Sequence, residues 1–336
     1  MRVLIVKRGA LGDVVRTSYF AKALKQSNSP SIHITWLTAE SAEPLLRYNP
    51  FIDRIATSFD ELRGECYDQL YSLDDERDTI ERVSELMASR ITGAYLDGDS
   101  IVYTADASVW FDMGLLSRFG KARADQLKKE NRRSHTDIFR EIFGVGHVEP
   151  VFYGDPQEEQ QAHEWLGTRF FTVAVNPFAG GRWPSKALRE SELRMLVKAL
   201  LSRQGADGRP VRVLLLGAGD DRKRNLVLAT EIVSERLWVA DTDASVLRLA
   251  AVVGASNVLI SSDSLALHLA IAQHIPVVAF FAPTPAAEID TFGLGIKVVS
   301  TASDYCSYKK DADNCSLTAD RLLKAFDKLI GAILVN

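Results

Sequence analysis

The chain has 336 residues, a length that predicts two domains. Its composition is that of an ordinary globular protein, 46% hydrophobic and 25% charged, so each half can bury a core of its own. The formal net charge of −4 argues against a general nucleic-acid binder, and three cysteines do not make an extracellular disulfide framework.

The first half alternates short apolar runs with helical patterns. The apolar runs at 3–6, 32–37, 67–73 and 91–96 predict strands, and the apolar spacing predicts a helix that opens at Asp13 and further helices over 40–48 and 76–89. Repeated strand–helix units of this kind predict a parallel sheet with helices on both faces.

A basic segment follows, from Trp110 to Arg133. Its pattern is helical, and two interpretations stay open: a solvated helix face, or a landing surface for a phosphorylated or acidic-sugar acceptor. The basic residues are Arg118, Lys121, Arg123, Lys128, Lys129, Arg132 and Arg133.

A polar stretch from 149 to 160, which carries two prolines and a glycine, predicts the linker between domains at 1–155 and 156–336. After it the alternation restarts, with strands predicted at 170–175, 211–216 and 237–240 and helices at 189–201, 222–234 and 244–253. Periodicity therefore predicts two doubly wound α/β domains. The apolar run at the N-terminus is too short for a signal peptide, and no apolar stretch approaches membrane-spanning length, so we expect a cytosolic protein.

The most informative stretch runs from Val258 to Thr284. A buried strand ends abruptly in Ser261, Ser262, Asp263 and Ser264, so polar groups stand at the carboxyl end of a strand, where open parallel sheets bind their ligands. Asp263 or Ser264 can cap the following helix, whose free N–H groups favour an anion such as a diphosphate. His268, one turn into that helix, faces either this site or the core.

Three further turns follow predicted strands. Small residues in the loop Asn176-Pro177-Phe178-Ala179-Gly180-Gly181-Arg182-Trp183-Pro184 let backbone N–H groups approach a phosphate, and Arg182 offers a bidentate contact. Asp220 or Asp221, after a glycine turn, can bind ribose hydroxyls or simply form a loop. In the first turn, Gly12 permits close approach of a ligand, and Asp13 is either a helix N-cap or a functional carboxylate.

Taken in order, these motifs resemble the family 9 glycosyltransferases, the heptosyltransferases that build the lipopolysaccharide inner core. The resemblance covers most of the chain: Gly12-Asp13-Val14, the loop from Asn176 to Pro184, Asp263-Ser264 with His268 and Ala270, and the Pro283-Thr284 turn. It implies a GT-B fold, in which two Rossmann-like domains face each other across a cleft. The N-terminal domain would bind the acceptor and the C-terminal domain the nucleotide sugar.

The resemblance also implies an activity and its residues. An inverting transfer of heptose from ADP-heptose to a saccharide hydroxyl would need no cofactor and no bound metal. Asp13 would take the hydroxyl proton, although a helix N-terminus favours its ionised form and so lowers its basicity. Lys7, Arg8 and Gly12 would lie on the acceptor side. The donor-binding residues would be Asn176, Ala179, Gly180, Gly181, Arg182, Lys186, Asp220, Asp221, Asp263, Ser264, Leu265 and His268.

Two departures from the family pattern bear on the donor site. Gly181 stands where the family has a lysine, for which Arg182 or Lys186 could substitute, and Leu265 replaces a glycine. These departures keep open a catalytically idle nucleotide-sugar-binding protein, and a nucleotide-sugar epimerase shares the architecture. A lipopolysaccharide acceptor would bring the protein to the inner face of the cytoplasmic membrane through surface charge. Cys306 and Cys315 flank a polar loop, where they could pair, hold a metal or be unrelated thiols.

Overall fold

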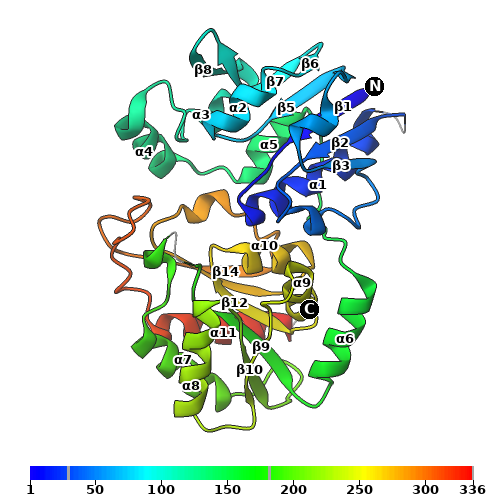
Figure 1. Cartoon of the computed structure of the whole chain (residues 1–336). Helices are drawn as coiled ribbons and strands as arrows, with labels where there is room; N and C mark the ends of the chain where they lie inside the picture. The colour runs from blue at the N-terminus through cyan, green and yellow to red at the C-terminus, as the bar shows by residue number, and fades with distance from the viewer. Residues whose placement is uncertain (29–30, 181–182, 335–336) are drawn as a thin grey trace. The chain divides into compact units, whose positions relative to one another are not determined.

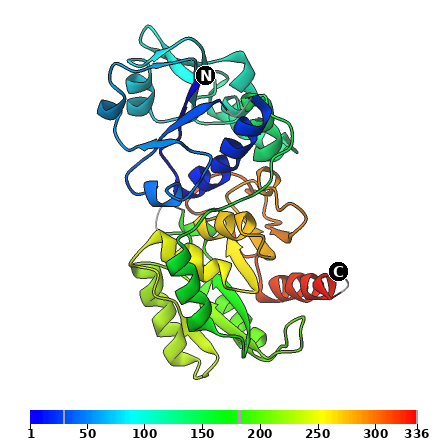
Figure 2. The ribbon, with the colours of Figure 1, turned by 90° about the vertical axis from the view of Figure 1, so that its right-hand side faces the viewer.

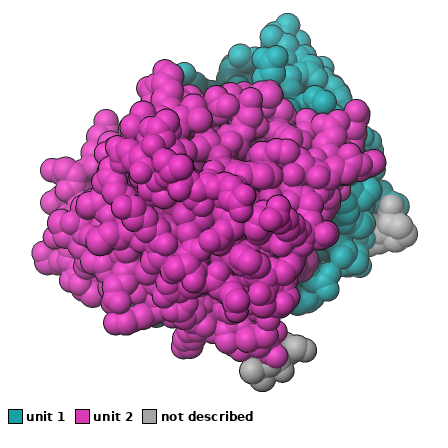
Figure 3. All heavy atoms as spheres, turned by 90° about the horizontal axis from the view of Figure 1, so that it is seen from below, with its two compact units in different colours: residues 1–153, 287–290 teal, residues 154–286, 291–336 magenta. Residues whose placement is uncertain are grey.

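The structure is a computed structural model and describes residues 1–28, 31–180 and 183–334 (Figure 1). The chain divides into two compact units, which are coloured separately in Figure 3. Unit 1 comprises Met1–Tyr153 and Ala287–Asp290, and unit 2 comprises Gly154–Ala286 and Thr291–Asn336. A short segment from late in the chain is therefore part of the first unit.

Unit 1 is built on a six-stranded sheet with the order β3-β2-β1-β5-β7-β8. Neighbouring strands are parallel, except that β8 pairs antiparallel with β7 at the edge. The order reverses beside β1, so the gap between the ends of β1 and β5 is a topological switch point. The strands are β1 (Arg2–Val6), β2 (His33–Leu37), β3 (Arg54–Ala56), β5 (Gln69–Ser72), β7 (Ile91–Asp97) and β8 (Ser100–Tyr103), and β4 (Cys66–Tyr67) pairs separately with β6 (Met87–Ala88).

Helices cover both faces of this sheet. On one face α1 (Leu11–Asn28) packs on α5 (His135–Phe143), where the rings of Phe20 and Phe143 stack with centroids 4.8 Å apart. On the other face, side chains of η2 (Phe59–Leu62) and α2 (Arg77–Val83) pack against Leu4 and Val6 of β1. The remaining elements are η1 (Glu43–Leu45), η3 (Ala105–Ala107), α3 (Ser108–Phe111) and α4 (Gly120–Glu130).

Three of the helices expected in unit 1 differ from those observed. The segment 40–48 forms only the short 3-10 turn η1, because Pro44 lies inside it and cannot donate to a helical hydrogen bond. The predicted helix at 76–89 ends at Val83, and the chain continues to β6. The basic segment is interrupted by turns between α3 and α4.

Unit 2 carries a six-stranded, fully parallel sheet with the order β11-β10-β9-β12-β13-β14. This is the strand order of dinucleotide-binding Rossmann folds, and its switch point lies between β9 and β12. The strands are β9 (Phe171–Asn176), β10 (Val211–Leu215), β11 (Leu237–Val239), β12 (Val258–Ser262), β13 (Val277–Phe281) and β14 (Gly295–Val299). The central strands read as continuous apolar runs because both of their faces are buried.

Two layers of helices enclose the second sheet. On one face α7 (Glu190–Leu201) packs on α11 (Ala319–Ile333), the C-terminal helix drawn in red in Figure 2. On the same face α8 (Asp220–Glu231) lies beside α7, to which it is joined by the Arg194–Glu231 ion pair, and it contacts β11. On the other face α9 (Val246–Gly254) packs on α6 (Pro156–Leu166) and α10 (Leu265–Ala272). The last 3-10 turns are η4 (Pro184–Lys186) and η5 (Ala286–Glu288). In the described part of the chain, no helix combines the length and apolarity needed to span a lipid bilayer.

Candidate functional site

The switch point of unit 2 is lined by neutral polar groups. Asn176 is the last residue of β9, and its register partner on β12 is Ser261. The Asn176 amide donates to Ser264 Oγ at 2.9 Å and to Ser261 Oγ at 3.3 Å, and the two hydroxyl oxygens are 2.9 Å apart. An amide and two hydroxyls thus meet where α/β sheets bind ligands, and each of these groups can also bond to a phosphate or a sugar.

A charged cluster stands beside these groups. The Lys186 ammonium, carried by η4, donates to the backbone oxygen of Asp263 at 2.9 Å and to its carboxylate at 3.0 Å. His268 is buried, and its Nε2 lies 3.4 Å from the other oxygen of the Asp263 carboxylate. His268 therefore faces the switch point. Lys186, one of the two residues expected to substitute for the missing lysine, also reaches it.

The N-terminus of α10 points its backbone N–H groups toward the same place. Ser264 occupies the N-cap position, but its side chain makes no capping hydrogen bond and bonds to Asn176 instead. The capping role that the sequence allowed for Ser264 is therefore not the one observed. Leu265, the first residue of the helix, is half-buried. Because the Ser264 side chain does not cap the helix, the backbone N–H groups at its positive end can stabilise an anion.

The loop after β9 is held by the start of α8. Gly180 has a φ of +69°, a conformation that favours glycine, and its N–H donates to Asp221 Oδ2 at 3.1 Å. Arg224 lies over the Phe178 ring, 3.7 Å from its centroid. Ala179 is half-buried, whereas Gly181 and Arg182 lie outside the described residues. Asp221 thus orders the predicted phosphate loop.

The neighbouring carboxylate differs in its surroundings. Asp220, the first residue of α8, is exposed and pairs with Lys223 at 2.7 Å. This hydrogen bond to Lys223 lowers the pKa of the Asp220 carboxyl. The sequence did not distinguish the roles of these two carboxylates, but the structure does: Asp221 fixes the loop, and Asp220 faces solvent.

The switch point of unit 1 is filled by charged groups. Lys7, directly after β1, is buried, and its ammonium donates to Asp74 Oδ1 at 2.8 Å. The backbone N–H of Arg8 donates to the other oxygen of Asp74 at 2.7 Å, and the Arg8 guanidinium donates to Thr79 Oγ1 at 3.4 Å. Asp74 follows β5, the strand that adjoins β1. Asp74 therefore contacts both residues that the resemblance assigned to the acceptor side, Lys7 through its ammonium and Arg8 through its backbone N–H.

The environment of Lys7 shifts its acidity. Burial alone would lower the pKa of the ammonium, but the carboxylates of Asp74 and Asp13 outweigh this effect and raise the pKa above its ordinary value of 10.5. Lys7 is therefore charged at neutral pH.

Asp13 lies in the first turn of α1, two residues after the helix begins at Leu11, so it is not the N-cap. Arg16 lies one turn further along, and its Nη2 is 2.8 Å from Asp13 Oδ1. The Arg16 guanidinium also lies over the Trp110 ring, 5.6 Å from its centroid. Gly12 is buried in the same turn of the helix. Arg16 thus orients the carboxylate while roughly a third of the Asp13 side chain, 35%, stays exposed.

Sequence reasoning did not identify Asp74 and Arg16. The signal for Asp74 was an acidic residue directly after a predicted strand, the same signal that identified Asp263. The signal for Arg16 was a cation three residues after Asp13, which places both side chains on one face of a helix.

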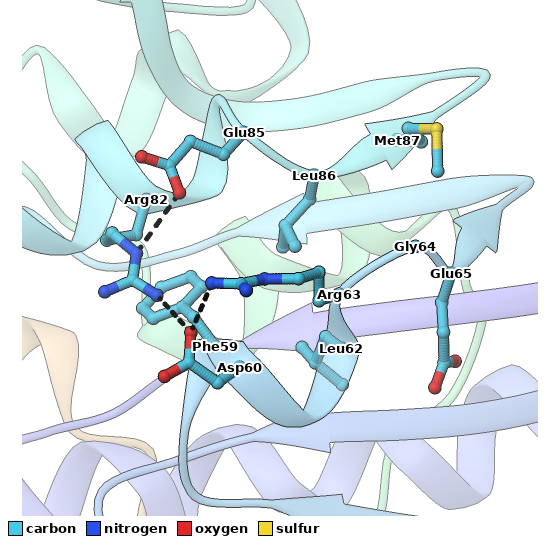
Figure 4. A pocket seen from close by; sticks show the side chains of 10 residues that line it. All are labelled: Phe59, Asp60, Leu62, Arg63, Gly64, Glu65, Arg82, Glu85, Leu86 and Met87. Atoms are coloured by element: carbon cyan, nitrogen blue, oxygen red, sulfur yellow. Dashed lines mark hydrogen bonds and ion pairs between the residues drawn. The ribbon is translucent and has the colours of Figure 1, made fainter.

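A small pocket lies in unit 1 (Figure 4). Its volume of about 150 Å³ is below the 300–1,000 Å³ or so that is typical of ligand sites. The ring of Phe59 forms part of its wall and lies near two guanidiniums, at 5.1 Å from Arg82 and 5.7 Å from Arg8. The pocket is lined by Phe59, Asp60, Leu62, Arg63, Gly64, Glu65, Arg82, Glu85, Leu86 and Met87. It is too small for a nucleotide sugar.

The cysteines do not pair. Cys306 is buried, Cys315 is exposed, and no disulfide joins them, so the predicted alternative of a disulfide between them is wrong. In residues 1–28, 31–180 and 183–334, no group of three or more His, Cys, Asp or Glu side chains is placed to hold a metal ion.

We compared the chain with known protein families, curated proteins and solved structures. No protein-family model and no curated protein matches the chain. Among solved structures, a family 9 glycosyltransferase from Veillonella parvula is 19% identical, with 98% of this chain and 97% of that chain covered and a TM-score of 0.74. The ADP-heptose lipopolysaccharide heptosyltransferase II of Escherichia coli is 15% identical, with 98% of each chain covered and a TM-score of 0.67. The E. coli heptosyltransferase WaaC with ADP is 17% identical, with both chains fully covered and a TM-score of 0.63. The chain therefore has the GT-B fold of these heptosyltransferases, as its resemblance to family 9 predicted.

Proposed function

We propose that the protein is an inverting, metal-independent glycosyltransferase that moves a heptose or related sugar from ADP-heptose to a saccharide acceptor such as the lipopolysaccharide inner core. The observation that carries this proposal is the polar switch point of unit 2, where Asn176, Ser264 and the Lys186–Asp263 pair meet the N-terminus of α10. In a fold shared with a heptosyltransferase solved with ADP, this set suits a nucleoside diphosphate.

The donor contacts follow from the chemistry of these groups. The N-terminus of α10, with the backbone of Ser264 and Leu265, would bind the diphosphate, and Lys186 would add a positive charge as the leaving group gains negative charge. Asn176 and the Asp263 carboxylate would fix the donor sugar. The hydroxyls of Ser262 and Thr284 are buried and make no hydrogen bond within the described chain, so they can also bond to a ligand. Arg182, Gly181 and Ala179 would complete the diphosphate contacts, and Asp220 or Asp221 would contact the ribose.

Unit 1 would supply the base and the acceptor contacts. A sugar hydroxyl is a weak nucleophile, so its oxygen attacks the anomeric carbon as Asp13 takes its proton. The bond from that carbon to the diphosphate oxygen breaks on the opposite face, ADP leaves, and the configuration inverts. Arg16 would hold the Asp13 carboxylate in position, and Lys7, Arg8 and Gly12 would line the acceptor side.

The first test is a thermal-shift titration with ADP, GDP, UDP and CMP. A nucleotide at about a hundred times its dissociation constant should stabilise the native state by about 2.7 kcal/mol. We expect selective stabilisation by ADP and a smaller shift in Asp263→Ala, each variant being compared with its own ligand-free midpoint. Asp320→Ala, an exposed carboxylate on α11, is the matched control.

The outcomes separate the alternatives. A preference for UDP or GDP would keep nucleotide binding in unit 2 but change the donor, and no response to any nucleotide would contradict the proposal. ADP binding without transfer to a broad acceptor panel would favour a catalytically idle binding protein. Conversion of the donor without any acceptor would favour an epimerase.

A further inference from the structure

Unit 1 exposes two large apolar side chains on a turn that is otherwise firmly held. Residues 112–119 connect α3 to α4, and within them Leu115 is 81% exposed and Phe119 is 53% exposed. Both side chains lie within the basic segment from Trp110 to Arg133. Isolated apolar side chains on a surface are ordinary, but two of them beside a strong charge need an explanation.

Contacts of Tyr103 hold this turn in place. The Tyr103 hydroxyl donates to Asp112 Oδ1 at 2.6 Å and accepts from the backbone N–H of Arg118 at 3.0 Å. The Tyr103 ring stacks on Phe111, with centroids 5.3 Å apart. Because hydrogen bonds and ring packing fix the turn, the exposure of Leu115 and Phe119 is a property of the folded unit.

Basic residues follow these apolar groups along the chain. Residues 118–133 carry seven basic and two acidic residues, a net charge of +5 in a chain whose overall charge is −4. The Arg118 guanidinium lies over the Phe119 ring at 5.0 Å, and the first turn of α4 carries Lys121 and Arg123 with no acidic residue. Cations in a first turn add to the positive end of a helix, which an anionic partner would offset.

The pairs within the segment leave a positive surplus. Four of the seven basic residues pair with carboxylates: Arg118 with Asp112, Lys121 with Asp125, Arg123 with Glu130 and Arg133 with Glu141. Lys129 and Arg132 are exposed, and no carboxylate in the described chain pairs with them. We therefore propose that Leu115, Phe119 and the basic residues of 118–133 form a docking surface for an anionic lipid bilayer. Apolar side chains would enter the interface while lysines and arginines contact the headgroups.

A bilayer fits these observations better than a free phosphorylated saccharide. A saccharide phosphate would use the cations but would gain nothing from the exposed leucine and phenylalanine. An interfacial contact needs no spanning helix, which agrees with the helices described above. The proposal concerns binding alone and does not depend on the transferase activity.

The test is co-sedimentation of the full chain with vesicles of pure phosphatidylcholine, or of phosphatidylcholine with phosphatidylglycerol. We expect binding to the anionic vesicles only, weakened by salt. Reversal of the charges in Lys129→Glu/Arg132→Glu should lower the partition coefficient at least about tenfold, since each basic residue near the surface contributes about fivefold. Leu115→Ser/Phe119→Ser should also weaken binding, by roughly tenfold.

Matched controls lie in unit 2. Val233→Ser removes an apolar side chain that is 94% exposed but has no basic segment beside it, and Lys324→Glu reverses an exposed charge on α11. Neither should change vesicle binding, and unchanged thermal midpoints would show that all variants fold. Equal binding to neutral and anionic vesicles, no binding to either, or equal losses in the controls would overturn the proposal. Self-association that depends on Leu115 and Phe119, without vesicle binding, would also overturn it and indicate a second copy of the chain as the occupant.

Discussion

The sheets of units 1 and 2 have a comparable strand order, in which the first strand stands near the centre and the order reverses beside it. Their switch points nevertheless carry different chemistry. In unit 1, Asp74 accepts from the Lys7 ammonium and from the backbone N–H of Arg8. In unit 2, the Asn176 amide and two serine hydroxyls bond to one another, and the charged Lys186–Asp263 pair stands beside them.

The difference shows that two sheets with the same strand order can differ in how readily they bind a phosphate. In unit 1 a carboxylate occupies the donors that follow β1, so a phosphate would have to displace a buried ion pair. In unit 2 the groups at the ends of β9 and β12, Asn176 and Ser261, are neutral, and a ligand can replace their mutual hydrogen bond at little cost because each bond is exchanged for another. The comparison therefore favours unit 2 as the nucleotide-binding unit, and the following experiments can break or sharpen it.

The largest effect is expected from Lys7→Met, which leaves the Asp74 carboxylate buried without its cation. Breaking a buried pair in this way should lower the free energy of unfolding by about 3–5 kcal/mol. Urea unfolding measures the change. The double variant Lys7→Met/Asp74→Leu should recover much of the loss, because it removes both charges. A loss below about 1 kcal/mol in the single variant would show that the pair does not hold unit 1 together.

Asp13→Asn should lower the rate of sugar transfer at least about a hundredfold, because an amide cannot take the hydroxyl proton. ADP binding should be unchanged, since the residues proposed to bind ADP are in unit 2. Steady-state kinetics and the thermal shift with ADP measure the two effects. Asp60→Asn changes an exposed carboxylate of unit 1 and serves as the control. Transfer at the wild-type rate by Asp13→Asn would remove the residue from the mechanism.

Lys186→Met should weaken ADP binding about tenfold, or about 1.4 kcal/mol, because one positive charge is lost beside the diphosphate. Calorimetric titration gives the dissociation constant. The control Lys324→Met removes an exposed lysine of unit 2, which pairs with Asp320 on α11. If both variants bind ADP as the wild type does, the diphosphate does not contact Lys186.

The smallest effect concerns pH. Because the pKa of Lys7 is raised in the folded chain, its stabilising contribution is fully present below its unfolded value of about 10.5 and is lost as the pH rises through the raised value. The stability difference between wild type and Lys7→Met should therefore be constant from about pH 8 to pH 10 and should narrow above that range. Urea midpoints measured for both proteins test this. A difference that narrows already below about pH 9 would contradict the raised pKa.

Most strands of unit 2 could be predicted from the sequence because strands buried on both faces read as unbroken apolar runs. The polar residues at the end of β12 could be predicted as a site because the change from the apolar run to Ser261 is abrupt. The predicted helix at 40–48 was wrong because Pro44 cannot donate a helical hydrogen bond, and the apolar spacing of the segment does not offset this loss.

Other features depend on contacts that a local pattern does not contain. Asp74 belongs to the switch point only because β5, rather than β2 or β3, lies on that side of β1. The role of Ser264 depends on Asn176, which lies 88 residues earlier in the chain. Without that partner in view, a serine before a helix indicates a cap, whereas the structure shows it bonded across the sheet.

The pairing of β9 with β12 also has a consequence for how the protein reaches its native state. The Asn176–Ser261 hydrogen bond joins residues 85 positions apart, and β10 and β11 lie between them in the sequence. Contacts of such long range pay their chain entropy before they gain any stability, so they tend to form late and slowly. The proposed nucleotide site would then be completed near the end of folding, and the recovery of ADP binding during refolding would time that last event.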